Sequence, residues 1–359
     1  MEDRKFAEGK RFVAGWDIGG AHLKMALCEN GVITHAATLK TSMWLGIEEV
    51  RNGIGTLRTD VPAGAANAFT MTAELSDGFS DRSEGVEGIL TLIEEEFGVR
   101  NTFIYAGRSG FVDTLRARGL APDIASANWH ATAALAASVV GEALFVDMGS
   151  TTTDIVALRD GKVANTGYAD AERLLSGELV YTGFARSALI GIANLVPVRG
   201  TMTPLMNEYF ANTADIARIL GMLDEADDQY PSADRREKTV AGSIGRLARM
   251  IGRDGPDLST EEWSDIALWF SEHQLRMVHD GAFRVATDHR LARGAPVIGA
   301  GIGRPQIRRL AARLERPFVD FGTLISAVEP ARDAACKAAP AAAVALLAAA
   351  QISKSADVV

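Results

Sequence analysis

Two short loops carry the clearest chemical signal in this sequence. Each follows an apolar segment and reads Asp-x-Gly, DIGG in one case and DMGS in the other. Glycine lets the backbone turn sharply and approach a ligand, and its N–H groups can bind phosphate oxygens. An aspartate beside such a loop can hold Mg²⁺ directly or through water, so Asp17 and Asp147 are the candidate metal-binding residues. The candidate phosphate-binding residues are Asp17, Gly19, Gly20, Asp147, Gly149, Ser150 and Thr151.

A third glycine-rich turn occurs in VIGAGIGR, where Gly299, Gly301 and Gly303 separate an apolar strand from a helix starting near Pro305. Such a turn suits a flat ring or another phosphate. It resembles a dinucleotide-binding motif only weakly, because no long βαβ unit with a suitably spaced acidic residue follows.

Polar residues at the end of a predicted strand are candidates for the reacting groups. MTAELSD places Thr72, Glu74 and Asp77 at a strand-to-loop exit, a common position for catalytic residues in α/β proteins. The two carboxylates could accept a proton, bind metal or orient an amine. The alternative is a solvated turn with a helix cap. SANWHATAA places Asn128 and His130 where a helix begins, and His130 is either a base or a structural histidine beside tryptophan.

Cationic side chains supply a further set of candidates. In YTGFARSAL, Tyr181 and Thr182 precede a glycine, and Arg186 follows it. Arg186 could bind a phosphate or a carboxylate, or form a surface ion pair. Arg108, which also follows a predicted strand, has the same two interpretations.

An internal repeat positions the first two loops. GWDIGGAHLKMALCENGVI, starting at Gly15, is echoed by FVDMGSTTTDIVALRDGKV, starting at Phe145. Each copy predicts a strand, an Asp-x-Gly turn, a second strand, and an Asn-Gly or Asp-Gly hairpin leading to a third strand. The sequence therefore predicts two similar domains, each opening with a β-meander.

The remaining pattern is that of an α/β protein with a helix-rich second half. Strands are expected in AFTMTAE, TFIYAG and APVIGAGIGR. Helices are expected near residues 47–57, 86–97, 128–140, 178–195, 205–223, 234–251, 260–286 and 305–314. We expect a first domain over residues 1–127 and a second over 128–331, with a C-terminal helix at 332–359 packing on the first. A chain of this length usually forms two domains, here two lobes around a cleft.

Bulk properties narrow the classes of partner. The net charge of −9 disfavours a nucleic-acid partner. The charged N-terminus lacks the apolar run of a signal peptide, which favours the cytoplasm. The apolar stretch AAPAAAVALLAAA is too short to span a membrane and predicts a buried helix. Cys28 and Cys336 have neither disulfide-framework nor zinc-site spacing.

Several stretches together resemble one family within the actin-like, hydantoinase/oxoprolinase-related group, the tetrahydromethanopterin-linked one-carbon pathway proteins. They run in order from Gly15 to Arg304. The stretches are GWDIGGAHLK, MTAELSD, SANWHATA, FVDMGSTTTDIV, ELVYTGFARSAL, NEYFANTADIARILG, RLARMIGRD and VIGAGIGR. The resemblance implies a two-lobed actin-like (ribonuclease H-like) α/β fold.

The resemblance also implies an activity. The expected enzyme is a synthase that joins an aminomethylfuran methyl diphosphate to the phenol oxygen of a γ-glutamylated tyramine or a tyrosine-type acceptor, releasing diphosphate. The phosphate loops, with Lys24, would then hold Mg²⁺ and diphosphate. Glu74, Asp77, His130 and Lys24 would be the catalytic candidates, and Thr72, Arg108, Asn128, Tyr181, Thr182 and Arg186 the substrate-binding candidates.

The sequence departs from many ATP-using relatives in one respect. Ala21 follows Gly20, where those relatives carry a hydroxyl residue. The expected reaction does not require ATP, although ATP binding stays open. Two alternatives also stay open: an ATP-dependent kinase or hydantoinase/oxoprolinase-like amidohydrolase, and a non-catalytic actin-like nucleotide-binding scaffold. A homo-oligomer is compatible with each of them.

Overall fold

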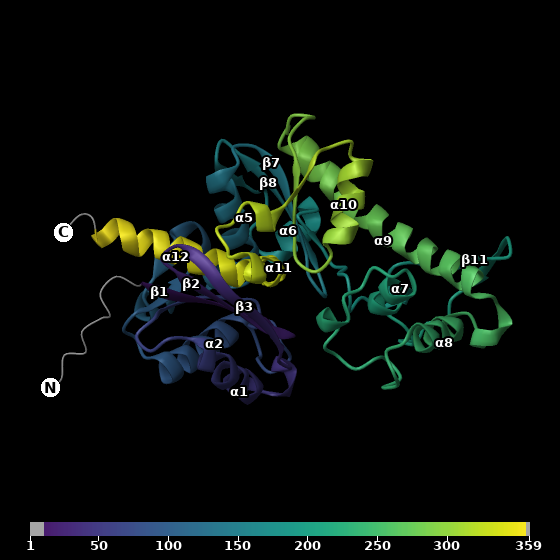
Figure 1. Ribbon diagram of the computed structural model, residues 1–359, viewed down its shortest axis with the longest axis horizontal. Helices are drawn as coiled ribbons and strands as arrows, with labels where there is room; N and C mark the ends of the chain where they lie inside the picture. The colour runs from purple at the N-terminus through teal and green to yellow at the C-terminus, as the bar shows by residue number, and fades with distance from the viewer. Residues whose placement is uncertain (1–10, 357–359) are drawn as a thin grey trace. The chain divides into compact units, whose positions relative to one another are not determined.

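The computed structural model describes residues 11–356 and divides into two compact units (Figure 1). The first unit contains the chain up to Gly141, Leu158–Val163, and the chain from Asp320 onward. The second unit contains Glu142–Ala157 and Ala164–Val319. The first unit therefore includes the helix at Asn128–Val139, whereas the sequence analysis places the domain boundary before that helix.

The first unit is built on a six-stranded sheet with the order β3-β2-β1-β4-β5-β6. The strands are β1 Phe12–Ile18, β2 His22–Glu29, β3 Val32–Lys40, β4 Ala66–Met71, β5 Thr102–Tyr105 and β6 Phe111–Val112. The predicted meander is confirmed, since β1 pairs antiparallel with β2 and β2 with β3. Asn30 at the β2–β3 turn has φ of 52°, the left-handed conformation of a tight hairpin turn.

Helices cover both faces of this sheet. They are α1 Ile47–Leu57, α2 Arg82–Phe97, α3 Thr114–Ala117, α4 Ala121–Ile124, α5 Asn128–Val139, α11 Glu329–Lys337 and α12 Ala339–Ala356. On one face, Trp16 stacks on Phe69 and α1 and α2 complete an apolar core. On the other, α12 packs along β1, β2 and β4 and also contacts α5 (Figure 1). Residues 341–345 of α12 are fully buried, as predicted for the closing helix.

Two consecutive helices of this unit, α11 and α12, are rich in apolar residues. Within residues 11–356, no single helix is long and apolar enough to cross a membrane. Together, α11 and α12 reach that length and apolarity, but the two helices are bent by 113° relative to each other.

The second unit repeats the meander in a sheet with the order β10-β8-β7-β13-β14, with β9 beside β8. The strands of this sheet are β7 Ala143–Met148, β8 Thr153–Arg159, β9 Lys162–Ala164, β10 Leu179–Val180, β13 Val297–Ala300 and β14 Phe318–Asp320. The turn between β8 and β9 belongs to Leu158–Val163, which groups with the first unit. β13 pairs parallel with β7, which places Ala300 beside Asp147. Asp160 at the β8–β9 turn has φ of 52°, the same value as Asn30 in the first copy. The predicted duplication is therefore present in backbone geometry as well as in sequence.

The helices of the second unit differ in position from those that the sequence predicts. They are α6 Asp170–Ser176, α7 Thr213–Ile219, α8 Val240–Met250, α9 Thr260–Asp288 and α10 Arg304–Arg313. The prediction of a helix at 178–195 is wrong, because that segment forms β10, turns and a short 3-10 helix at Leu189–Gly191. The helix predicted at 205–223 begins only at Thr213, after β11 Leu195–Val198 and β12 Thr201–Pro204. Asn212 caps α7 by accepting hydrogen bonds from the N–H groups of Ala214 and Asp215.

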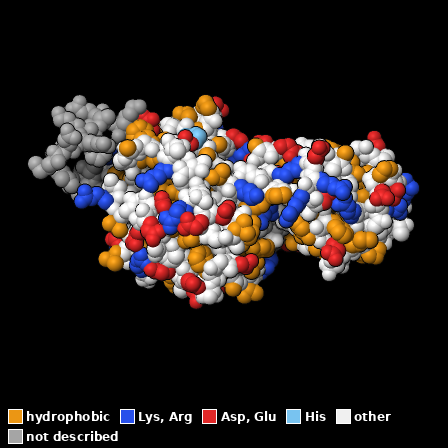
Figure 2. Space-filling model, turned by 90° about the horizontal axis from the view of Figure 1, so that it is seen from below, with side chains coloured by type: hydrophobic (Ala, Val, Ile, Leu, Met, Phe, Trp, Pro, Cys, Tyr) orange, Lys and Arg blue, Asp and Glu red, His pale blue; other side chains and the backbone are white. Residues whose placement is uncertain are grey.

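Charged side chains of both signs are spread over the molecular face in Figure 2, where Lys and Arg lie among Asp and Glu.

Candidate functional site

The DMGS loop of the second unit is held by a hydrogen bond within the loop and by hydrogen bonds from the segment that follows β10. The Gly149 N–H donates to the Thr152 carbonyl at 3.0 Å. The N–H groups of Phe184 and Arg186 donate to the carbonyls of Gly149 and Ser150, at 2.9 and 2.8 Å. These bonds occupy carbonyl groups of the loop and leave a turn in which N–H groups can face an anion.

Two glycines bring neighbouring segments against this loop. A Cβ on Gly183 would lie closer than 3.0 Å to backbone atoms of Ser150 and Thr151. A Cβ on Gly301 would lie equally close to Asp147 Oδ1 and the Met148 backbone, and Gly301 has φ of +79°. The structure thus brings together the DMGS loop, the 181–187 segment and the VIGAGIGR turn. Glycine is required at both contacts because no other residue leaves room for them.

Buried polar side chains hold the 181–187 segment in place through hydrogen bonds to Thr182 and Gly183. Thr213 Oγ1 donates to the Gly183 carbonyl at 2.9 Å, and Gln274 Nε2 donates to the same carbonyl at 2.7 Å and to Thr182 Oγ1 at 3.0 Å. Thr153 Oγ1 donates to the Thr182 carbonyl at 2.7 Å. The sequence analysis missed Thr213, Gln274 and Thr153, since each is a single polar residue without a recognisable motif.

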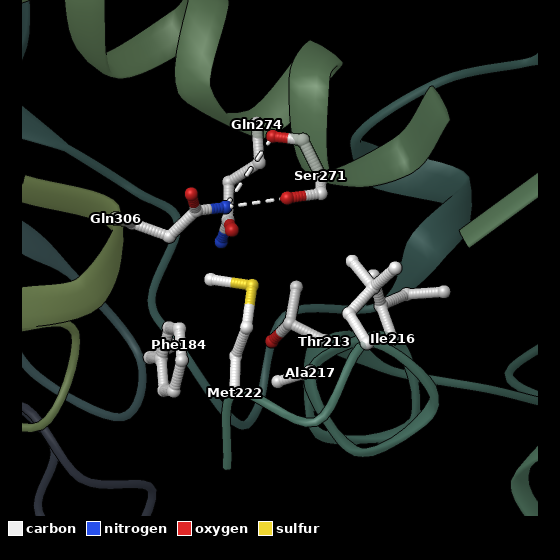
Figure 3. A pocket seen from close by; sticks show the side chains of 9 residues that line it. Phe184, Thr213, Ile216, Ala217, Met222, Ser271, Gln274 and Gln306 are labelled. Carbon is white, nitrogen blue, oxygen red and sulfur yellow. Dashed lines mark hydrogen bonds between the residues drawn. The ribbon is translucent and has the colours of Figure 1, made fainter. Parts of the chain in front are cut away.

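A small cavity lies behind this segment, between α7, α9 and α10 (Figure 3). Its volume is about 10 Å³, close to the volume that holds one water molecule. Polar groups of Thr213, Ser271, Gln274 and Gln306 line it together with apolar side chains. Gln306 Nε2 donates to Ser271 Oγ at 2.8 Å and joins α10 to α9.

An ion pair lies beside the DIGG loop of the first unit, between the buried Asp17 and the partly exposed Lys24 of β2. Asp17 is 1% exposed, and its Oδ2 accepts a hydrogen bond from Lys24 Nζ at 3.1 Å. Asp17 pairs with Lys24 on β2 and with Thr70 on β4, so the three residues form a row across the sheet. Asp17 Oδ1 and Thr70 Oγ1 are buried and make no hydrogen bond within residues 11–356. An unsatisfied buried carboxylate oxygen is costly, which makes this row suitable for a bound cation or water.

The donor set fits Mg²⁺ but not a metal held by protein ligands alone. Among residues 11–356, no three His, Cys, Asp or Glu side chains are grouped closely enough to hold a metal ion. Mg²⁺ is usually bound by one or two carboxylates, with water and phosphate oxygens completing its octahedron. Asp17 and Asp147 could each provide such a carboxylate.

The rest of the DIGG loop resembles its counterpart in the second unit. The Gly19 N–H donates to the His22 carbonyl at 3.0 Å, just as the Gly149 N–H donates to the Thr152 carbonyl. The carbonyl of Gly20 is occupied by the Met43 N–H at 3.1 Å. Thr72 lies next to this loop, because its N–H donates to the Ile18 carbonyl at 2.9 Å.

The three candidate bases differ in environment. Glu74 is 1% exposed, and its Oε1 accepts a hydrogen bond from Ser126 Oγ at 2.7 Å. His130 is buried at the start of α5, and its Nδ1 lies 2.9 Å from Tyr105 Oη. Asp77 is exposed in the turn after β4. Sequence reasoning missed Ser126 and Tyr105, which contact these groups from distant parts of the chain.

The remaining candidates are less closely associated with the loops. Arg108 and Tyr181 are exposed. Asn128 accepts a hydrogen bond from the Trp129 N–H, which is a local contact at the helix start. Gly299 lies inside β13, buried against Phe318.

The chain is similar in sequence to one protein family and to two named enzymes of archaea. The model of the hydantoinase/oxoprolinase family matches residues 65–294. The chain is 31% identical over 285 residues to the (4-{4-[2-(gamma-L-glutamylamino)ethyl]phenoxymethyl}furan-2-yl)methanamine synthase of Methanocaldococcus jannaschii. That match covers 79% of this chain and 84% of the synthase. The synthase of the same name from Methanococcus vannielii is 29% identical over 173 residues, covering 48% of this chain and 76% of the relative.

A solved structure supports the fold. The nucleotide-free structure of acetone carboxylase matches with a TM-score of 0.54 and 10% identity, over 94% of this chain and 70% of that one. The predicted fold class, a duplicated actin-like α/β fold, is confirmed.

Proposed function

The chain belongs to the hydantoinase/oxoprolinase family, and we propose that it is a synthase of methanofuran-type cofactors. The observation that carries this proposal is the 31% identity to the Methanocaldococcus jannaschii synthase over most of both chains. The name of that relative describes a phenoxymethylfuran, which contains an aryl ether. We assign the formation of this ether to the present chain.

The reaction exchanges one carbon–oxygen bond for another. The phenol oxygen attacks the CH₂ of an aminomethylfuran methyl diphosphate, and the bond from this carbon to the diphosphate oxygen breaks. Diphosphate leaves with the electron pair, while the phenolic proton passes to a base. The furan ring is electron-rich and stabilises positive charge on the CH₂ carbon, so a well-bound leaving group is the main requirement.

We assign the diphosphate to the converging segments of the second unit. Gly149, Ser150 and Thr151 provide backbone N–H groups and hydroxyls, and Gly301 allows the neighbouring turn to approach Asp147. Mg²⁺, held by Asp147 of the same unit, would neutralise charge on the leaving diphosphate. This chemistry requires no ATP.

The direct test is to supply the furan diphosphate and a γ-glutamylated tyramine without nucleotide. We expect the ether product and diphosphate in equal amounts, measured by mass spectrometry and a diphosphate assay. Omitting the phenol should stop diphosphate release. Turnover that requires ATP and produces ADP would instead favour the kinase or amidohydrolase alternative.

Proton removal from the phenol is the second assignment. A phenol has an ordinary pKa of about 10, so at neutral pH a base must accept its proton as the new bond forms. Glu74 and His130 are both buried and each has a hydrogen-bonded partner that orients it. Of the three candidates, these two have the burial expected of a group that reacts away from bulk water.

We expect Glu74→Gln or His130→Gln to reduce kcat by about 10²–10⁴-fold, the usual contribution of a general base. The base variant should also lose the pH-dependent limb of the rate profile, measured with saturating furan diphosphate. Asp77→Asn is the matched control, because this exposed carboxylate should leave both rate and profile unchanged. If Glu74→Gln and His130→Gln both retain the parent profile, neither residue is the base.

A further inference from the structure

A long irregular segment of the second unit, which we call the 220–239 strap, connects α7 to α8. It contains one short 3-10 helix, Glu225–Asp227, and no other regular element. Connections longer than about 12–15 residues without secondary structure are uncommon in compact domains and are often functional. The contacts that hold the strap therefore call for an explanation.

Two buried arginines outside the strap hold it at several points. Arg218 donates to Glu225 at 2.8 Å and to Asp228 at 2.7 Å, and its side chain is 4% exposed. Arg246, whose side chain is fully buried, donates to Asp234 Oδ1 at 3.2 Å. Burial alone would raise the pKa of the Asp234 carboxyl, but hydrogen bonds and the charge of Arg246 lower it to about 2. Asp234 is thus a stable anion at neutral pH.

Both arginines are joined at Asp215. Arg246 Nη2 donates to Asp215 Oδ1 at 2.7 Å, and Arg218 Nη1 lies 3.6 Å from the same oxygen. Ser243 Oγ also donates to Asp215 Oδ1, at 2.8 Å. Asp215 and Arg218 lie in NTADIARILG, and Arg246 in RLARMIGRD, two stretches to which the sequence analysis gives no chemical role.

Such a network is a poor source of stability. Removing charges from water costs several kcal/mol per ion, and apolar side chains of similar volume often serve equally well. Buried ion pairs can instead select one conformation among several. We infer that the network around Arg218 and Arg246 selects one conformation of the strap.

Tyr230 of the strap contacts Arg186, which lies in the 181–187 segment next to the DMGS loop. The guanidinium carbon of Arg186 lies 4.3 Å from the centroid of the Tyr230 ring. The backbone N–H of Arg186 donates to the Ser150 carbonyl of the DMGS loop at 2.8 Å. An arginine that stacks through its flat face still presents N–H groups along its edge, the arrangement that suits phosphate oxygens.

We propose that Tyr230 is a positioning residue for Arg186, and that Arg186 in this orientation binds the diphosphate of the substrate. The identity of the anion depends on the proposed function. The diphosphate is favoured over a carboxylate of the acceptor because the Arg186 backbone is anchored on Ser150, next to Gly149 of the phosphate loop. The strap and its ionic network then determine how tightly the second unit holds the leaving group.

The test measures binding of inorganic diphosphate, with Mg²⁺ present, by calorimetry on the full chain. Tyr230→Leu removes the ring and should weaken binding by about 2- to 30-fold, the range for loss of a cation–π contact. Tyr230→Phe keeps the ring and is the matched control, with binding equal to the parent. Arg186→Lys keeps the charge but not the planar stack and should weaken binding similarly, which provides a second variant if Tyr230→Leu does not fold.

Steady-state kinetics separate the possible ligands. We expect KM for the furan diphosphate to rise in Tyr230→Leu while KM for the phenolic acceptor stays constant. A rise confined to the acceptor would overturn the assignment to diphosphate. Equal diphosphate binding by the parent, Tyr230→Leu and Arg186→Lys would overturn this inference alone, whereas a parent chain that binds no diphosphate would overturn the proposed function as well.

Discussion

Replacing Asp147 with asparagine is expected to lower kcat/KM for the furan diphosphate by about 10²–10³-fold, because the carboxylate that would hold Mg²⁺ against the leaving anion is lost. Asp147 lies at the end of β7, 8% exposed, beside the DMGS loop and the Gly301 turn. Asparagine has nearly the same shape, so core packing is unchanged and only the carboxylate charge is lost. Mg²⁺-dependent binding of diphosphate should weaken in parallel.

Three measurements check this prediction: turnover as a function of Mg²⁺ concentration, diphosphate affinity by calorimetry, and Tm. Tm should stay close to that of the parent. Asp265→Asn removes an exposed carboxylate from α9 in the same unit and should change none of the three. A parent-like Mg²⁺ dependence in Asp147→Asn would remove this residue from the proposed metal site.

Gly301→Ala is expected to have an effect of similar size on activity and also to destabilise the fold. The added Cβ would contact Asp147 Oδ1 and the Met148 backbone at less than 3.0 Å. In addition, φ of +79° at this position is unfavourable for any residue with a side chain, at a cost of about 1–3 kcal/mol. Since neither contact is the end of a long flexible side chain, the turn must move away from the DMGS loop.

Activity assays and thermal unfolding of Gly301→Ala test this expectation. Gly294→Ala is the matched control, because a Cβ there meets no atom within 4 Å and φ lies outside the left-handed region. Gly294→Ala should retain activity and Tm. Full activity in Gly301→Ala would show that the close approach of the two segments is not needed for turnover.

The elements that sequence predicts well are those encoded locally. The duplicated β-meander is visible because alternating apolar residues and hairpin turns repeat at equivalent spacing, and Asn30 and Asp160 have the left-handed φ that those turns require. The prediction of helices fails at 178–195 and at the start of 205–223. Apolar residues in those segments satisfy helical periodicity, but Gly183 packs on the DMGS loop and β11 pairs with β12. Long-range contacts there override local preference.

For this protein, the sequence by itself determined the repeat, the positions of the Asp-x-Gly loops and the residue types available to bind a phosphate. Only the tertiary structure decided which distant groups support those loops. Gln274 reaches Gly183 across 91 positions, Ser126 reaches Glu74 across 52, and Tyr230 lies against Arg186 without any motif that links them. The physical reason is that a hydrogen bond or stacked pair depends on distance and direction in space, and packing of helices on each sheet sets both.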